Sequence, residues 1–369
     1  MEEELIALLT LLQMEGLGGR QIRKLRRQWG SLEELWSPFA SSTLPPSLQM
    51  RLSALSELRK QAETILSTCD RLGIAVIPYY DNRFPPLLEE IPSPPAVLYK
   101  KGPHSLTEQP LVAVVGTRKP SAYGMKATET FVEALVAAGV GIVSGLAYGI
   151  DAHAHRVTLE KKGKTIAVLA HGLDRIYPSI HRRLADAILA EGAWVSEYPP
   201  GTKLHPLLFP YRNRIIGGLA HLTLIVESRE KGGALFTARA AFEANRPVFA
   251  VPGSIFSPVS QGPHLLIAEQ IAHIASSPTA LIEELKVQTQ RLPLPPSSSE
   301  KQKVPLHPLH AEIYALLLQG QKHIDEICIA LGRSVVELIP HLLQMEIEGW
   351  IQQKPGGFIC REAPPDAKF

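Results

Sequence analysis

The sequence predicts an α/β protein built on an extended, doubly wound, Rossmann-like parallel sheet, and two observations carry this prediction. Apolar strand-like runs alternate with helical patterns from about residue 111 to 285, at the spacing of roughly 25 to 30 residues that βαβ crossovers need. The strand-like runs are continuously apolar, as in Leu111 to Val115, which is typical of strands that helices cover on both faces.

The strands expected in this sheet are short and rich in β-branched or apolar residues. We expect strands at 112–115, 141–143, 165–169, 193–196, 223–226 and 247–251. We expect helices near 125–138, 149–161, 180–190, 208–219 and 234–244. Because ligands of such sheets bind beyond the carboxyl ends of the strands, the loops that follow the strands are the expected place for a functional site.

The chain has 369 residues, which exceeds one typical domain, and its composition changes toward both ends. We expect a helical domain at 1–72, the sheet domain at 73–289, a Pro/Ser-rich linker at 290–306 and a winged helix at 307–369. The proline-rich stretch from Ile77 to Gly102 also carries large apolar residues, so we expect it to pack on the sheet, with short strands at 74–77 and 96–99.

The helical domain contains a glycine turn, Gly16 to Gly19, that is typical of a helix-hairpin-helix motif. Such a turn can present backbone N–H groups at a helix N-terminus to a DNA phosphate. The alternative is a small packing module with a solvated basic face. The cations that follow the turn are Arg20, Arg23, Lys24, Arg26 and Arg27.

Composition and charge limit which cellular compartment and which binding partners we expect. The formal net charge is +2, so any basic surface has to be local. The 3 cysteines show no metal-like spacing, which fits a reducing compartment. The acidic start of the chain is unlike a signal peptide, and no apolar run reaches the roughly 20 residues that span a bilayer. We therefore expect a cytoplasmic protein without a membrane partner.

The loops after the expected strands gather glycines, hydroxyls and cations. The first of them, Gly116 to Gly124, combines free backbone N–H groups with two cations and predicts an anion site. Because all these loops should face one edge of the sheet, their charges add up to a local field that suits a polyanion. The cations are Arg118, Lys119, Arg175, Arg182, Arg183, Lys203, Arg212, Arg214, Arg229 and Lys231.

Other site classes fit the residues poorly. No second glycine follows Gly116 at the dinucleotide-binding spacing, a Walker A loop is absent, and Ser144 is not in a G-x-S-x-G elbow. Asp151, His153 and His155 lie two apart on an expected helix, where such residues point away from one another. We expect Asp151 to cap the helix or tether the glycine loop, His155 to be buried, and neither a metal nor a cofactor to bind.

Several motifs, in this order and spacing, resemble the DNA-processing protein A (DprA/Smf) family: GTRKPSAYG, SGLAYGIDAHAH, AVLAHGLDRIYP, FPYRNRIIGGLA and FTARAAFEANRPVFAVPG. The resemblance covers about residues 73 to 285. It implies an extended Rossmann fold that binds and protects single-stranded DNA without sequence preference, forms homodimers and loads the RecA recombinase in natural transformation. It implies no catalytic activity.

The resemblance also assigns site residues. It implies that Arg118 lies beside a DNA phosphate, that Arg182 or Arg183 belongs to a basic pocket, and that Arg212 to Arg214 is the family's RNR segment, in which Arg214 has bracing of loops as an alternative role. We expect DNA contacts from Gly116, Thr117, Arg118, Lys119, Ser121, Gly145, Gly149, Arg182, Arg183, Lys203, Arg212, Asn213, Arg214 and Lys231.

The chain departs from the family pattern at two places. His181 stands where asparagine is common, and Lys231 to Gly233 stands where Ser-Gly-Ser is common. The second change keeps a close backbone approach and adds a cation, but it removes hydroxyls. Aromatic residues near the loops are expected to stack bases, with a place in the core as the alternative for each. They are Tyr123, Tyr148, Tyr177, Phe209 and Tyr211.

Two further surfaces are predicted. The apolar segment Gly262 to Leu285 is expected to complete the core or to form a dimer and recombinase interface, with His264, Leu265, Ile267 and Ile271 as its contacts. In the winged helix, the expected recognition helix at 333–348 carries one arginine against several glutamates. Protein interaction is therefore a better prediction for that helix than duplex reading.

An enzyme that processes nucleotides is the alternative function. EKGGALFTARAA is similar to the phosphate loop of the nucleoside-monophosphate phosphoribohydrolases often described as lysine decarboxylases. In that family P-G-G-x-G-T is followed by glutamates, whereas here Ala234, Leu235 and Phe236 intervene and the catalytic glutamate is missing. Single-strand binding and base release from nucleoside monophosphates distinguish the two functions.

Overall fold

The computed structural model describes residues 2–14, 17–37, 54–291, 308–317, 320–347, 351–354 and 358–361. The chain divides into two compact units, residues 1–294 and 295–369. The division lies inside the linker expected at 290–306, most of which is outside the described residues. None of the described helices is both long and apolar enough to cross a membrane.

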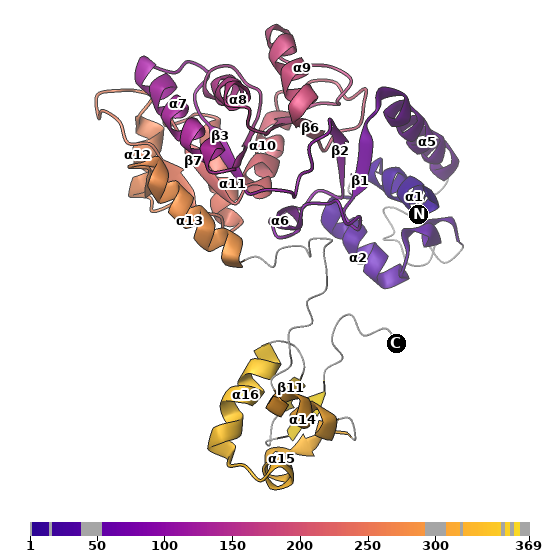
Figure 1. Cartoon of the computed structure of the whole chain (residues 1–369). Coiled ribbons are helices and arrows are strands. Elements are labelled where there is room, and N and C mark those ends of the chain that lie inside the picture. Colours follow the sequence, from indigo (N-terminus) through magenta and orange to yellow (C-terminus); the bar gives the residue numbers. More distant parts are fainter. Residues whose placement is uncertain are drawn as a thin grey trace. The chain divides into compact units, whose positions relative to one another are not determined.

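Unit 1 is built on a nine-stranded sheet with the order β1-β2-β6-β5-β4-β3-β7-β8-β9 (Figure 1). Its strands from β3 onward are parallel, and they confirm the predicted Rossmann-like sheet. These strands are β3 (Leu111–Val115), β4 (Gly141–Ser144), β5 (Thr165–Leu169), β6 (Ala193–Ser196), β7 (Leu222–Ile225), β8 (Val248–Ala250) and β9 (His273–Ile274). The last of them, β9, was not predicted.

The strand order changes direction at β3, which pairs with β4 on one side and β7 on the other. This reversal is the topological switch point at which such sheets bind ligands. The proline-rich stretch adds the two edge strands, β1 (Ala75–Pro78) and β2 (Val97–Lys101), on either side of the short helix α6 (Pro86–Glu89). Both edge strands were expected, and each pairs antiparallel with its neighbour, β1 with β2 and β2 with β6.

Helices cover both faces of the sheet, as the continuous apolarity of the strands predicts (Figure 1). One face packs against α7 (Ala122–Ala137), α8 (Ile150–Glu160) and α13 (Pro278–Arg291). The other face packs against α6, α10 (Leu208–Leu219), α11 (Ala234–Glu243) and α12 (Gln261–Ala268). Between β5 and β6 lie the 3-10 turn η3 (Ser179–His181) and α9 (Arg182–Glu191).

The N-terminal helices share a core with one end of this sheet. They are α1 (Glu2–Leu12), α2 (Gly19–Trp29), η1 (Leu32–Trp36) and α5 (Leu55–Leu72). Leu8, Ile22 and Leu25 belong to the same buried cluster as Tyr99 of β2 and Trp194 of β6. The boundary predicted at residue 72 therefore lies within unit 1 rather than between separate units.

The glycine turn before α2 packs closely against another segment of the chain at Gly19. The backbone N–H of Gly18 donates to Gln21 Oε1 at 3.1 Å. A side chain at Gly19 would meet the backbone of Ala96, 3.2 Å from its nitrogen, so this glycine allows the close approach of two segments. The Gly18 N–H is thus engaged within the turn, and presentation of this turn to DNA stays a prediction. Gly16 lies outside the described residues.

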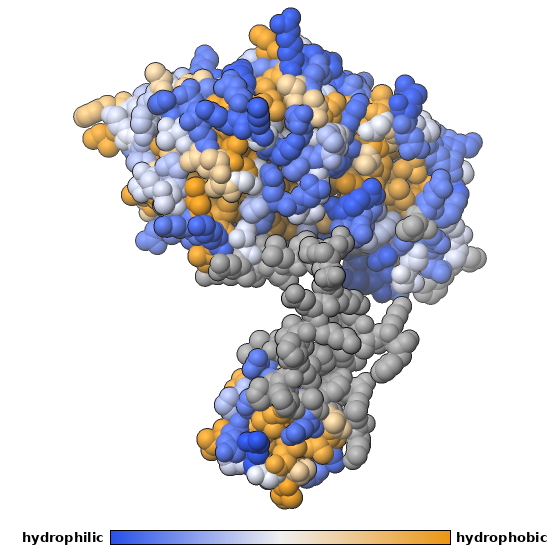
Figure 2. Space-filling model, in the orientation of Figure 1, coloured by the Kyte–Doolittle hydropathy of each residue, from blue (hydrophilic) through white to orange (hydrophobic). Residues whose placement is uncertain are grey.

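Unit 2 is the predicted winged helix. It comprises α14 (Pro308–Leu317), α15 (Ile324–Leu331), α16 (Val335–Ile347) and a sheet of the order β10-β12-β11. The strands are β10 (Lys322–His323), β11 (Ile351–Lys354) and β12 (Phe358–Arg361). Apolar side chains reach its surface, among them Ile329 at 83% and Val336 at 80% exposure (Figure 2).

Candidate functional site

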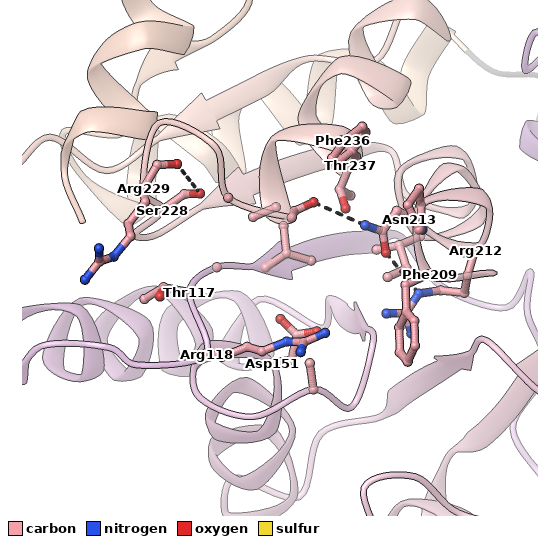
Figure 3. A pocket seen from close by; sticks show the side chains of 18 of the residues that line it. Thr117, Arg118, Asp151, Phe209, Arg212, Asn213, Ser228, Arg229, Phe236 and Thr237 are labelled. Carbon is pink, nitrogen blue, oxygen red and sulfur yellow. Dashed lines mark hydrogen bonds between the residues drawn. The ribbon is translucent and has the colours of Figure 1, made fainter. Parts of the chain in front are cut away.

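A pocket of about 400 Å³ opens at the carboxyl ends of β3 and β7, at the switch point of the sheet (Figure 3). Four segments surround it: the loop after β3, the start of α8, the start of α10 and the loop between β7 and α11. Its polar or aromatic lining residues are Thr117, Arg118, Asp151, Phe209, Arg212, Asn213, Ser228, Arg229, Lys231, Phe236 and Thr237. A pocket therefore lies at the edge of the sheet where the anion site is expected, and anion binding there stays a prediction.

A buried pair, Asp151 and Arg212, forms the floor of the pocket. Arg212 is only 4% exposed and donates from Nη1 to the carbonyls of Gly145, at 2.8 Å, and of Val168. Its Nε donates to Asn213 Oδ1 at 3.0 Å. The guanidinium therefore braces the ends of β4 and β5, and its hydrogen bonds point into the protein.

Burial shifts the pKa values of the two floor residues in opposite directions, and each residue opposes the shift of the other. Burial lowers the pKa of Arg212 to about 10, against the opposing effect of the Asp151 carboxylate. Burial raises the pKa of Asp151, against the effects of Arg212 and of the N–H groups of Ala147, Gly145 and Gly116. Arg212 still carries its charge at neutral pH, so the pair supplies a preorganised floor and not a free cation.

The glycines of the site serve close packing. The N–H of Gly145 donates to Asp151 Oδ2 at 3.2 Å, and Asp151 also accepts from Gly116. A side chain at Gly145 would overlap the Arg212 guanidinium, and Gly149 has a φ of 77° against the backbone of Arg118. These N–H groups hold Asp151, which agrees with the tether predicted for that residue, and contacts from Gly116 and Gly145 to DNA stay predictions.

The rim of the pocket consists of Arg118, Arg229 and Lys231, which are exposed. No ion pair joins any of them to a carboxylate in the described part of the chain. Arg118 extends toward the middle of the pocket, where its guanidinium lies 5.8 Å from the centre of the Phe209 ring (Figure 3). The rim thus presents positive charge that is not paired with a carboxylate of the described residues. The floor below it consists of Asp151 and Arg212, which have their hydrogen-bond partners within the protein.

Other predicted site residues lie outside the pocket lining. Lys119, Arg182, Arg183 and Lys203 are exposed in loops or helix starts along the same edge of the sheet. His181, the departure from the family pattern, is buried, with Nδ1 2.9 Å from the carbonyl oxygen of Leu146. It therefore ties the start of α9 to the glycine loop after β4.

Two predicted contacts are engaged within the protein. Ser121 caps α7 and donates its hydroxyl to Glu227 Oε1 at 2.5 Å, while its N–H donates to Oε2 of the same carboxylate. Arg214 binds both carboxylate oxygens of Glu197, at 2.6 and 2.5 Å. The bracing role considered for Arg214 thus agrees with this ion pair. The Ser121 hydroxyl is engaged by Glu227, and its contact with DNA stays a prediction.

Four residues of the site were not predicted from the sequence: Glu227, Ser228, Phe236 and Thr237. Glu227 is 2% exposed and fixes the loop after β3, while Phe236 is 56% exposed and lines the pocket. A signal was available for Phe236: it follows two glycines at the start of a helix that begins at a strand end, where a side chain reaches the ligand edge.

The aromatic residues divide into two groups. Phe209 lines the pocket and contacts Tyr177 edge-on, with ring centres 6.0 Å apart. Tyr148 contacts His181, and Tyr211 is 63% exposed. Tyr123 instead donates its hydroxyl to the Pro252 carbonyl at 2.6 Å, beside a separate cavity.

The D-x-H-x-H side chains diverge as expected. The Nδ1 of His155 lies 2.7 Å from Thr165 Oγ1, and burial lowers the pKa of this histidine to about 3. His153 Nε2 faces Glu129 at 3.4 Å. Among the described residues, no three His, Cys, Asp or Glu side chains come together as a metal site.

The predicted dimer segment lies on α12 and the turn after it. Leu265, Ile267 and Ile271 are half-buried against the sheet core, and His264 Nε2 lies 3.1 Å from the Gly253 carbonyl oxygen. Part of this segment therefore completes the core, and its role as an interface stays a prediction.

Fold and site together define a class: a Rossmann-like protein with a pocket rimmed by cations at its switch point, followed by a winged helix. The family model described as DNA recombination-mediator protein A matches residues 75–286, and the DprA winged helix domain matches residues 295–357. The chain belongs to the DNA recombination-mediator protein A family.

Individual relatives cover most of the chain. Protein Smf of Escherichia coli is 38% identical over 310 residues, which are 83% of this chain and 82% of that protein. DNA processing protein DprA of Bacillus subtilis is 41% identical over 222 residues, which are 60% of this chain and 74% of that protein.

Two solved structures share the fold. DNA processing protein A from Streptococcus pneumoniae superposes with a TM-score of 0.66 at 34% identity, covering 77% of this chain and 98% of that one. The protein of the same name from Helicobacter pylori, described for its single-stranded DNA binding mode, gives a TM-score of 0.53 at 28% identity, covering 58% of this chain and 96% of that one.

Proposed function

We propose that this chain binds single-stranded DNA without sequence preference in the pocket at the ends of β3 and β7. The observation that carries the proposal is the rim, where Arg118, Arg229 and Lys231 have no ion pair in the part of the chain that the structure describes. Cations of this kind bind phosphates and release counterions, which supplies sequence-independent affinity.

The form of the pocket supports an unpaired strand. Phe209 and Phe236 line it, and an aromatic ring stacks on any base. The exposed cations outside the lining continue along the same edge of the sheet, so a flexible strand can follow them. Single-stranded DNA is also the ligand in the description of the Helicobacter pylori relative.

Binding without catalysis is the second part of the proposal. Asp151 is the one carboxylate among the lining residues that the structure describes, and it is buried against Arg212 and backbone N–H groups. Glu227, the acidic residue in the loop between β7 and the glycines, accepts hydrogen bonds from Ser121. These carboxylates have structural partners, which argues against the phosphoribohydrolase alternative.

The family resemblance extends the proposal. We infer that the chain protects the bound strand, acts as a homodimer through the α12 segment and loads a RecA-type recombinase in the cytoplasm during natural transformation. Sedimentation that gives only monomer at micromolar concentration, with and without DNA, would contradict the dimer.

The test is the affinity of the full chain for a fluorescent oligothymidylate of about 16 nucleotides, measured by anisotropy across a salt series. Arg118→Gln should bind roughly three- to tenfold more weakly at about 0.1 M salt and lower the slope of log K against log salt by about 0.7. Arg71→Gln is the matched control. Arg71 is exposed near the end of α5, just before the amino end of β1, whereas the pocket lies at the carboxyl ends of the strands.

Equal affinity of Arg118→Gln and the parent protein at low salt would remove this pocket from the binding site. Release of a free base from a nucleoside monophosphate, assayed with the same preparation, would instead support the enzyme. Because the two assays use different ligands, either result is interpretable without the other.

A further inference from the structure

A second pocket, of about 330 Å³, lies between α2 and the turn that follows β1. It is lined by Arg23, Arg26, Arg27, Gly30 and Tyr79, and we call it the arginine cleft. The surface over α2 is strongly hydrophilic (Figure 2). The cleft belongs to unit 1 but involves none of the residues of the pocket at β3 and β7.

Two of its arginines are fixed by tyrosine rings. The Arg23 guanidinium lies 4.0 Å from the ring centre of Tyr79, and that of Arg26 lies 4.4 Å from the ring centre of Tyr80. Arg26 also pairs with Glu4 at 2.8 Å, which neutralises it. Stacked guanidinium groups are preorganised, so less side-chain entropy is lost when they bind an anion.

Arg23 and Arg27, unlike Arg26, form no ion pair with a carboxylate of the described residues. Arg23 donates one hydrogen bond, from Nη2 to the Pro95 carbonyl at 3.0 Å, and its Nε is buried without a partner. Arg27 is exposed and has no ion pair in the described residues. Burial lowers the pKa of Arg23, while Glu89 is the nearby acid that opposes this effect. A half-buried cation with an unused donor beside an exposed cation suits an oxyanion, and phosphate above all.

The strand directions place the cleft on the same edge of the sheet as the first pocket. Because β1 is antiparallel to β2, and β2 is antiparallel to β6, β1 runs in the direction of β6 and of the other parallel strands. Tyr79 directly follows the carboxyl end of β1, just as Gly116 follows that of β3. Figure 1 shows α2 beside β1 at one end of the sheet.

The distance along this edge suits one strand of nucleic acid. From β3 to β1 the order of the sheet has five strand spacings, which amount to roughly 24 Å. The loops in between carry Arg182 and Arg183 after β5 and Lys203 after β6, all exposed. Positive side chains therefore continue from the first pocket to the arginine cleft.

We propose that the arginine cleft holds a phosphate of the same DNA strand that occupies the pocket at β3 and β7. The N-terminal helical segment thus extends the DNA-binding surface through the arginine side chains of α2. The inference rests on the proposed function, and it adds a second contact that only a longer strand reaches.

The experiment compares oligothymidylates of about 4 and about 16 nucleotides on the full chain. Arg27→Gln should weaken binding of the longer strand roughly threefold to tenfold at about 0.1 M salt and lower its salt slope by about 0.7. It should leave the short strand unchanged. Arg23→Gln should act in the same direction. If Arg23→Gln fails to fold, Arg27→Gln still tests the cleft, because Arg27 is exposed and forms no ion pair with the residues that the structure describes.

The controls separate the possible failures. Arg71→Gln, on the neighbouring helix α5, should change neither oligonucleotide. If the parent protein binds and Arg118→Gln weakens both strands, but Arg27→Gln binds the long strand normally, the cleft proposal is wrong and the first pocket stands. If inorganic phosphate or ATP binds the parent protein and not Arg27→Gln, with no effect on the long strand, the cleft serves a free phosphate ligand and the proposal is likewise overturned.

Discussion

The rim and the floor of the pocket at β3 and β7 both contain arginine, but the arginines have opposite roles. Arg118 on the rim is exposed and has no ion pair in the described chain, whereas Arg212 on the floor is 4% exposed and donates to the Gly145 and Val168 carbonyls. The comparison shows that a group of basic residues in a sequence includes residues that are available to a ligand and residues that hold loops together. Burial distinguishes the two kinds.

The largest effect is expected at the floor. Arg212→Leu leaves the Asp151 carboxylate buried without its counter-ion, which should lower the free energy of unfolding by roughly 3 to 5 kcal/mol. The measurement is urea denaturation at pH 7. Adding Asp151→Asn should restore part of the loss, since the uncompensated charge is then gone. A change below about 0.5 kcal/mol in the single variant would show that Arg212 is no brace.

Lowering the pH should reduce the stability of the folded protein through the buried His155. Burial, with cationic neighbours, lowers the pKa of His155 from 6.5 to about 3, so the folded protein keeps this imidazole neutral. The unfolded chain takes up a proton below pH 6.5. The stability that His155 contributes is therefore complete above pH 6.5 and is lost as the pH falls toward 3.

The measurement compares the parent protein with His155→Gln. Between pH 7.5 and 4.5 the parent should lose roughly 2 to 3 kcal/mol more of its free energy of unfolding than the variant does. The glutamine is neutral and can still bond Thr165, so it isolates the titration of the imidazole. Parallel pH profiles of the two proteins would show that this histidine is protonated equally in both states.

The division between rim and floor was partly readable from the sequence. Arg212 precedes Ile215 by three positions and Ile216 by four, so on a helix it shares their buried face. Arg214 lies on another side of α10, where it meets Glu197. The family resemblance assigns the whole RNR segment to the binding site, whereas the helical spacing assigns its first arginine to the interior of the protein.

The sheet itself was more predictable than the site. Continuous apolar runs are sufficient for strands covered on both faces, and each predicted parallel strand was confirmed within a residue or two. Contacts between segments far apart in the sequence were not predictable, because nothing local links Glu227 to Ser121 or Tyr79 to Arg23 of α2. The arginine cleft depends on such a long-range contact, so it required the structure.

The smallest effect is expected from Arg175, a cation at a strand end that the sequence counts with the rim. Its guanidinium pairs with the adjacent Asp174 at 3.0 Å, so the pair contributes little net charge to the surface. Arg175→Gln should lower stability by less than about 1 kcal/mol, because surface ion pairs contribute little. In the oligothymidylate assay its salt slope should match that of the parent, whereas Arg118→Gln lowers the slope. A reduction as large as that of Arg118→Gln would mean that DNA displaces Asp174 from Arg175, and the rim would then extend to the loop after β5.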